Sequence, residues 1–493
     1  MNSEDIIILI SFAVYLLVML LIGWFFYSRT SNLSDYVLGG RKLNSWVTAL
    51  SAQASDMSGW LLLGLPGYAY LSGLESVWLL VGLLIGTYAN WKFVAARLRK
   101  YTEIANNSIT LPDYFENRFS TNNKTIRIVS AIFILIFFLI YTSSGFVAGA
   151  KLFSSVFDIS YIQALLIGGF VIVSYTFLGG FLAVSWTDVI QGSIMFFAII
   201  FVPIYAIIAN GGFQFTLTEI IVLNSNHLSI FTNNEGELIS LITVFSLLGW
   251  GLGYFGQPHI LARFMAIKDV DHIKKARKIA MNWVTFSLIS AMLLGMIGYA
   301  IFPDFLQGTD SEKIFILMVE QLVHPLLAGI LLAAILAAIM STADSQLLVA
   351  SSSLTEDIYK YIFRKSASDL ELVWISRFFV IFIAIVAILI GLDQNSSVLD
   401  LVAYAWAGFG ATFGPIIILS LYWKGISEKG AIAGMIIGGM TIIIWKNLSG
   451  GIFDLYEIIP GFLFATITIL LFREKNNKKM SQIENDFKII SKY

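Results

Sequence analysis

The residues best suited to chemistry lie in one apolar stretch near the start of the chain. Residues 43–66 are apolar enough to cross a membrane except at one cluster of polar side chains, which is followed by Gly59. The cluster consists of Ser51, Gln53, Ser55, Asp56 and Ser58. A carboxylate at mid-bilayer costs ~2.5–3.5 kcal/mol on insertion scales, so it is normally held against a cavity, a partner or an ion. The stretch predicts a cation site, with Asp56 in it, in an interrupted transmembrane helix.

A second polar face lies in residues 325–353. Ser341, Thr342 and Ser345 follow Ala338 at helical spacings that put all four on one face, and Asp344 lies one turn below Ser341. Sodium is a hard cation, and hard cations prefer oxygen ligands from hydroxyls, carbonyls and carboxylates. We therefore expect the hydroxyls of this face, together with carbonyls of the unwound 43–66 segment, to form an oxygen cage for sodium.

A second interrupted segment occurs at residues 238–257. Glycines at 249, 251, 253 and 256 and the proline at 258 free backbone groups, which must be satisfied by neighbours, water or a ligand in a membrane. Trp250, Tyr254 and Pro258 share one helix face. That face either packs in the core or shapes an apolar pocket for a small ring or side chain. Two interrupted spans at matching places in two halves are typical of a transporter built from inverted repeats.

Composition restricts the class of protein. Of the 493 residues, 57% are hydrophobic and 13% charged, whereas soluble domains are about 25% charged. The net charge of −1 argues against a nucleic-acid partner, and the absence of cysteine excludes disulfides and thiolate chemistry. The high hydrophobic and low charged fractions predict a polytopic membrane protein. No phosphate-binding loop or His-Glu-x-x-His motif is present, and we expect that the protein is not an enzyme. We expect the first apolar run to be retained, because the residues before it are acidic.

The chain has about thirteen apolar segments long enough to cross ~30 Å of hydrocarbon. They lie at about 6–27, 43–66, 74–95, 127–150, 161–180, 187–209, 238–257, 279–302, 325–353, 372–391, 398–421, 431–447 and 455–472. Of the 31 Lys and Arg residues, all but Lys151, Lys313 and Lys446 then fall on one side. The positive-inside rule predicts an external N-terminus and a cytoplasmic C-terminus in the plasma membrane.

The two interrupted segments are five segments apart, which suggests inverted repeats of segments 2–6 and 7–11. The alternative is that the glycines only permit close packing of helices. The expected division of the single transporter domain is an extra N-terminal helix (1–40), a first repeat (41–210), a second repeat (238–422), two C-terminal helices (430–472) and a cytoplasmic tail (473–493).

The chain resembles the sodium/solute symporter family along essentially its whole length. The resemblance is carried by residues 35–41, 49–61, 111–115, 179–188, 249–263, 340–342, 346–349 and 404–410. It implies an all-α LeuT-type five-plus-five fold in which segments 2 and 7 are broken. It also implies secondary active transport by alternating access, with Na⁺ as the coupling ion and L-proline as the solute.

The resemblance further implies site residues. Sodium would be held by backbone oxygens of Ala54, Met57 and Ala338 and by the hydroxyls of Ser341 and Thr342, with Asp56 beside the ion. The solute side would consist of Ser55, Ser58, Gly59, Tyr141, Trp250, Tyr254 and Pro258. Arg41 and Asp188 would lie on the inner route of sodium release.

The chain departs from the family pattern at Asp344 and Ser345, where small uncharged residues are expected. Asp344 either binds a second cation or pairs with a neighbour without changing stoichiometry. The alternative function is sodium-coupled uptake of another organic solute, such as pantothenate, a sugar or another amino acid. A channel would need a continuous polar file across the membrane, and a sensor would need an output domain. The sequence indicates neither, so we favour a transporter. The expected partners are the solute, sodium and the lipid bilayer, with no obligatory protein partner.

Overall fold

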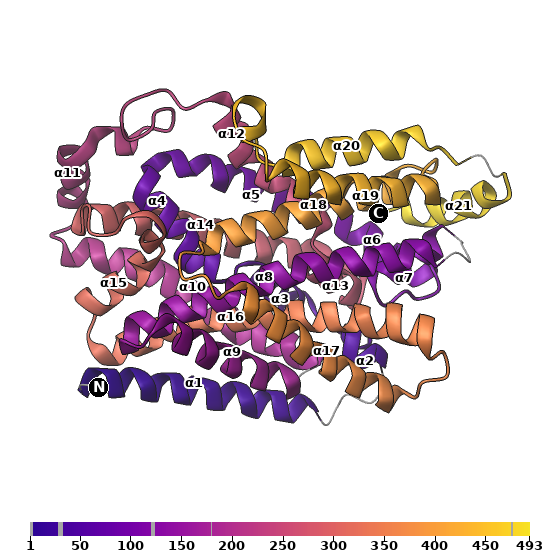
Figure 1. The fold of residues 1–493 in the computed structure, drawn as a ribbon, viewed down its shortest axis with the longest axis horizontal. Coiled ribbons are helices and arrows are strands. Elements are labelled where there is room, and N and C mark those ends of the chain that lie inside the picture. The colour runs from indigo at the N-terminus through magenta and orange to yellow at the C-terminus, as the bar shows by residue number, and fades with distance from the viewer. Residues whose placement is uncertain (1–2, 28–32, 120–123, 179, 475–476) are drawn as a thin grey trace.

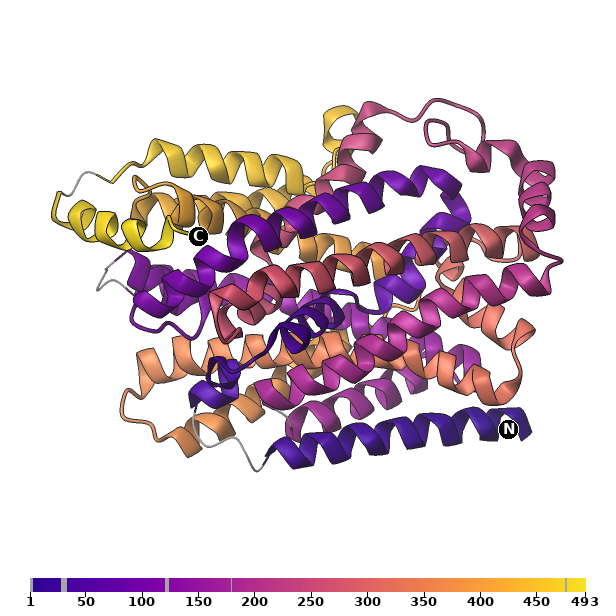
Figure 2. The same ribbon diagram turned by 180° about the vertical axis from the view of Figure 1, so that it is seen from behind.

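The computed structural model describes residues 3–27, 33–119, 124–178, 180–474 and 477–493. Within these ranges the regular structure is helical apart from isolated bridges at Leu43–Ile267, Thr232–Leu238 and Ile426–Arg473. The long helices run side by side along the long axis of the molecule (Figures 1 and 2). This is the arrangement a bilayer demands, because a helix satisfies its backbone hydrogen bonds internally.

The first half of the chain forms a series of helices that starts at one edge of the bundle. They are α1 (Ser3–Tyr27), α2 (Leu33–Leu38), η1 (Gly39–Arg41), α3 (Ser45–Asp56), η2 (Trp60–Gly64), α4 (Leu65–Ser72), η3 (Gly73–Ser76), α5 (Val77–Ala89), η4 (Asn90–Val94), α6 (Ala95–Ile104), α7 (Leu111–Arg118), α8 (Thr125–Phe157), α9 (Tyr161–Leu178), α10 (Phe181–Ala209), α11 (Phe213–Asn224) and η5 (Ser225–Leu228).

The second half continues in the same way to the opposite edge. Its helices are α12 (Leu241–Gly249), η6 (Trp250–Gly256), α13 (Pro258–Ala266), η7 (Val270–His272), α14 (Ile273–Ile301), η8 (Gly308–Lys313), α15 (Ile314–Leu322), α16 (Pro325–Ser353), η9 (Leu354–Phe363), α17 (Asp369–Ile390), α18 (Val398–Tyr422), α19 (Glu428–Trp445), η10 (Gly451–Asp454), α20 (Ile458–Leu471) and α21 (Asn477–Ile490).

In the described part of the chain, nine helices are long and apolar enough to cross a membrane, and three apolar helices are shorter. The all-helical class is therefore confirmed, while the count of thirteen spans stays a prediction. Helices also form in stretches expected to be loops, namely α7, α11 and α15. They have only 8, 12 and 9 residues, so a search for long apolar runs does not detect them.

Both predicted interruptions are present. The first segment divides into α3, η2 and α4, and the second into α12, η6 and α13. The second segment extends beyond its predicted end at residue 257, because Pro258 starts a new helix at its N1 position. Proline suits that position because the missing N–H has no partner in a helix there. Two of these pieces, α3 and α13, contact each other, and α3 also packs against α10 and α16.

Candidate ion and substrate site

The first break begins after Asp56. Asn44 caps the start of α3 by accepting hydrogen bonds from the backbone N–H groups of Trp46 and Val47, each at 3.0 Å. At the other end Met57 leaves helical geometry, with φ −83° and ψ 78°. The freed carbonyl of Asp56 accepts a hydrogen bond from the Trp60 indole at 3.0 Å and one from the Tyr141 hydroxyl at 3.3 Å. Side chains thus hold the break open.

The second break depends on close packing against α18. A Cβ added at Gly253 would lie 1.8 Å from the Trp406 indole nitrogen, and one at Gly256 would lie 2.1 Å from the Phe409 carbonyl oxygen. The Trp406 indole donates to the Trp250 carbonyl at 2.8 Å. The Gln257 amide donates to the carbonyls of Gly253 and Trp406 at 3.1 and 3.2 Å. The glycines therefore give α18 access to the unwound backbone.

The predicted sodium ligands of α3 and α16 meet at the Ala54 carbonyl. The hydroxyls of Ser341 and Thr342 donate to it at 2.8 and 3.2 Å, and Ser341 Oγ lies 3.1 Å from the Ala338 carbonyl. Met57, the fifth predicted ligand, is buried within the break. These are hard oxygen donors from two helices, and they suit sodium because each hydroxyl can turn its lone pair toward an entering cation.

Asp56 lies beside these oxygens with its carboxylate unsatisfied. The side chain is fully buried, and neither carboxylate oxygen has a hydrogen-bond partner in the described part of the chain. The Tyr254 hydroxyl approaches both this carboxylate and the Thr87 side chain without reaching hydrogen-bond geometry with either. A buried charge of this kind is costly unless a counter-charge is present. The negative charge therefore favours a cation at the adjacent oxygens.

The predicted solute residues divide between two places. Trp250 and Tyr254 are buried among rings: Trp250 lies 6.5 Å from Trp60, and Tyr254 lies 4.9 Å from Trp406, measured between ring centroids. Tyr141 joins them through the Asp56 carbonyl, beside Ser58 and Gly59 in the break. Ser55 instead faces away, with its hydroxyl 2.9 Å from that of Ser345. The aromatic face thus lines a buried region rather than the lipid surface.

A buried polar cluster surrounds Asp188 of α10. One carboxylate oxygen of Asp188 accepts from Ser51 at 2.6 Å, from Ser55 at 3.3 Å and from Arg263 at 3.2 Å. Arg263 also donates to the Ser345 hydroxyl at 2.5 Å. The structure therefore places Asp188, Asp344 and Ser345 together, as the sequence suggested, and adds Arg263 of α13.

Arg41 lies elsewhere. Its guanidinium donates to the Met265 carbonyl at 2.5 Å, to the Ser108 carbonyl at 2.8 Å and to the Asn107 side chain at 3.0 Å. Burial lowers the pKa of Arg41 to about 10, so it remains charged at neutral pH. It ties the inner end of α13 to the segment after α6 and does not join the Asp188 cluster.

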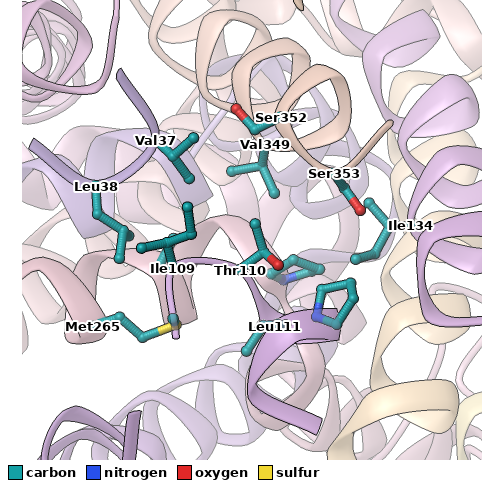
Figure 3. Close-up of a pocket in the computed structure, with 13 residues that line it drawn as sticks. Val37, Leu38, Ile109, Thr110, Leu111, Ile134, Met265, Val349, Ser352 and Ser353 are labelled. Carbon is teal, nitrogen blue, oxygen red and sulfur yellow. The ribbon is translucent and has the colours of Figure 1, made fainter. Parts of the chain in front are cut away.

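A narrow cavity lies between α13, α16 and the start of α7. One wall is the face of α13 made by Pro258, Ala262 and Met265. Figure 3 shows Val349, Ser352 and Ser353 of α16 opposite residues 37–38 and 109–111. The cavity offers about 20 Å³ to the centre of a water molecule, so it has room for about one water. The cavity is too narrow in this state for a solute to pass.

The short helix η8 packs against α4, α8 and α15. Glu312 is buried, with its carboxylate 2.5 Å from the Lys151 ammonium of α8. It also accepts from the backbone N–H groups of Val398 and Leu399 at 3.0 and 2.9 Å, at the start of α18. A Cβ at Gly67 of α4 would lie 2.8 Å from the Glu312 backbone nitrogen. Glu312 therefore fixes a segment that packs on α4, the second half of the first broken helix.

Sequence reasoning missed several residues of this region. Arg263 gives no signal of burial in the sequence, because an arginine at the end of a predicted membrane span is expected to reach the interface. Tyr15 of α1 was missed because the first helix looks like a plain apolar span, yet its hydroxyl accepts from Gln191 at 2.8 Å. Trp60 and Trp406 carried no signal beyond being aromatic.

Two broken helices that contact each other, with ion-type oxygens between α3 of the first and α16, are typical of a secondary transporter of the inverted-repeat class. The solved structure of a Na⁺-coupled sialic acid symporter has the same fold, with a TM-score of 0.75 at 20% identity over 95% of this chain and 99% of that one. The LeuT-type five-plus-five architecture predicted from the sequence is thereby confirmed.

The profile of the Sodium:solute symporter family matches residues 36–438, and the chain belongs to this family. It is 50% identical to the sodium/proline symporter of Salmonella typhimurium over 94% of this chain and 92% of that protein. It is 52% identical to the high-affinity proline transporter PutP of Bacillus subtilis over 92% of this chain and 94% of that protein. The chain is therefore a multi-pass membrane transporter and not an enzyme.

Proposed function

We propose that this protein takes up L-proline together with Na⁺ by alternating access. The observation that carries the proposal is the convergence of α3 and α16 oxygens at the Ala54 carbonyl beside the unpaired Asp56 carboxylate. The identity of about one half to proline transporters supports L-proline over pantothenate, a sugar or another amino acid. We assign the sodium site to Ala54, Asp56, Met57, Ala338, Ser341 and Thr342.

Sodium and solute would each complete the other's site. An ion at the Ala54 carbonyl ties α3 to α16 and neutralises Asp56, which leaves the Asp56 carbonyl and the neighbouring rings positioned for solute. The apolar proline ring suits the Trp250, Tyr254 and Tyr141 surfaces, and its charged groups suit the freed backbone at Ser58 and Gly59. Because coupling is reciprocal, proline must raise sodium affinity by the factor by which sodium raises proline affinity.

The cavity that starts at Pro258 supports a route for inward release between α13 and α16.

We propose that the protein lies in the plasma membrane with its N-terminus outside the cell and its C-terminus in the cytoplasm. Two observations support it: the positive-inside bias, and the position of α21 at the other end of the long axis from the N-terminus (Figure 1). We retain the division into residues 1–40, 41–210, 238–422, 430–472 and 473–493. No protein partner is required by this mechanism.

Asp188, Asp344 and Ser345 remain candidates for a second cation or for the sodium release path, whereas Arg41 contributes through the position of α13. A second ion would be detected by the ratio of charge to proline moved in proteoliposomes. Replacing Asp344 with serine would lower that ratio if it binds a coupling ion. An unchanged ratio would assign Asp344 to pairing alone.

Uptake in vesicles tests the proposed function. Radiolabelled proline should accumulate in proteoliposomes only when an inward sodium gradient is imposed, and an inside-negative potential should increase it, since each charge moved gains roughly 2.3 kcal/mol per 100 mV. Competition with unlabelled pantothenate, sugars and other amino acids separates the alternative solutes. Accumulation without sodium would contradict the proposal.

Trp250→Ala should weaken proline binding at saturating sodium by about tenfold or more, because the indole is buried beside Trp60 and its removal loses ring contact. Sodium binding measured without proline should change by less than about twofold, since no sodium oxygen comes from Trp250. Equilibrium binding of each ligand to purified protein checks both. Trp24→Ala is the matched control, since that indole is 71% exposed. An unchanged proline affinity would return Trp250 to core packing.

A further inference from the structure

Arg263 shares its buried surroundings with two carboxylates. The side chains of Arg263, Asp188 and Asp344 are all fully buried. The guanidinium donates to Asp188 Oδ2 at 3.2 Å, to the Ser51 hydroxyl at 3.0 Å and to the His259 carbonyl at 3.1 Å. The cluster therefore combines one guanidinium with two carboxyl groups, and when both acids are ionised it lacks one positive charge for neutrality.

The second carboxylate is within reach of the same guanidinium. Arg263 donates to Ser345 Oγ at 2.5 Å, and Ser345 Oγ lies 3.4 Å from Asp344 Oδ1. In the described part of the chain, Asp344 Oδ2 and Asp188 Oδ1 are buried without any hydrogen-bond partner. These two unsatisfied acceptors belong to different carboxyl groups, so the guanidinium has two alternative partners. Because buried charges persist only when they are paired, it must remain near one or both acids.

This cluster lies directly beside the candidate sodium site. Ser345 Oγ donates to the Ser341 carbonyl at 2.8 Å, one turn further along α16 from the hydroxyl that meets Ala54. Ser55, adjacent to Ala54 in α3, contacts both Asp188 and Ser345. In the proposed orientation α16 runs inward, so an ion that leaves the sodium site along α16 meets the Arg263 cluster first.

We propose that Arg263 is a tethered cation that occupies the Asp188–Asp344 pair when no metal ion is bound there, and that sodium must displace it on the inner route. This rests on the proposed function. Arg263 contacts Asp188 in the structure, and we assign this position to the carrier before sodium reaches Asp188. When sodium approaches Asp188, the guanidinium moves toward Asp344 through Ser345. Asp344, which departs from the family pattern, thereby gains a role as the second acceptor for Arg263.

The test is equilibrium binding of radioactive sodium alone to the purified full-length protein. Arg263→Gln removes the competitor and leaves both acids, so the sodium Kd should fall by about fivefold. Asp344→Ser removes the second acceptor, so Arg263 stays on Asp188 and the sodium Kd should rise by about fivefold. A merely structural arginine predicts weaker sodium binding in Arg263→Gln, which is the opposite sign.

The double variant Arg263→Gln/Asp344→Ser keeps the test decisive if the single arginine variant is not recovered. It should bind sodium more tightly than Asp344→Ser alone, and an equal or weaker affinity overturns the proposal. An unchanged or raised Kd in Arg263→Gln also overturns it. Arg99→Gln is the matched control, because Arg99 is a buried arginine that binds the Ile267 and Lys268 carbonyls and should leave the sodium Kd unchanged. Failure of the wild type to show sodium-dependent proline uptake would instead refute the proposed function.

Discussion

Asp56→Asn should weaken sodium binding by about 100-fold, which corresponds to about 3 kcal/mol. The carboxylate is fully buried, has no hydrogen-bond partner in the described part of the chain and lies two residues from the Ala54 carbonyl. Its negative charge is therefore available to a cation and to little else. Asparagine preserves the shape but removes that charge. Because sodium orders the solute site, sodium-dependent proline binding should fall with it.

Sodium titration of proline binding in membrane vesicles measures this effect, after the amount of variant protein in the membrane has been matched to wild type. Asp271→Asn is the matched control, because that carboxylate is exposed at the end of the bundle and should leave the titration unchanged. Near-normal sodium affinity in Asp56→Asn would remove Asp56 from the ion site and leave the oxygens around Ala54 as the whole of it.

Glu312→Gln should reduce proline uptake at least tenfold while leaving proline binding from the outside nearly intact. The variant leaves the Lys151 ammonium buried without its counter-charge and removes a carboxylate from the start of α18. Breaking a buried ion pair of this kind costs about 3–5 kcal/mol. These contacts fix η8 over α4, so their loss should favour a state that is open to the outside. Binding needs that state, whereas uptake needs the closed one.

Uptake and equilibrium binding in the same vesicle preparation separate the two effects. Lys151→Gln should behave in the same way, because it breaks the same pair from the other side. Asp310→Asn is the matched control: its ion pair with Lys313 is 2.7 Å long but exposed, and such pairs contribute about 0–1 kcal/mol. Equal losses of binding and uptake in Glu312→Gln would show that the pair supports the bound state rather than closure.

The sequence alone determined the class of protein and much of the ion site. Long apolar runs and few charges required a helical membrane protein, because the bilayer leaves backbone groups no other way to be satisfied. Asp56, Ser341 and Thr342 stood out because polar groups in such runs are costly and need a reason. The glycines after Leu248 similarly pointed to the second break. These features are local, so they can be read along the chain.

Only the tertiary structure decided which polar residues meet. Ser55 lies one residue from both Ala54 and Asp56, yet it faces Ser345 and Asp188 because helical rotation turns it away from the aromatic rings. Arg263 joins Asp188 although 75 residues separate them, since α13 packs against α3 and α3 against α10. Pairings of this kind depend on which helices touch and on which faces they present, and spacing along one helix contains no information about the orientation of another.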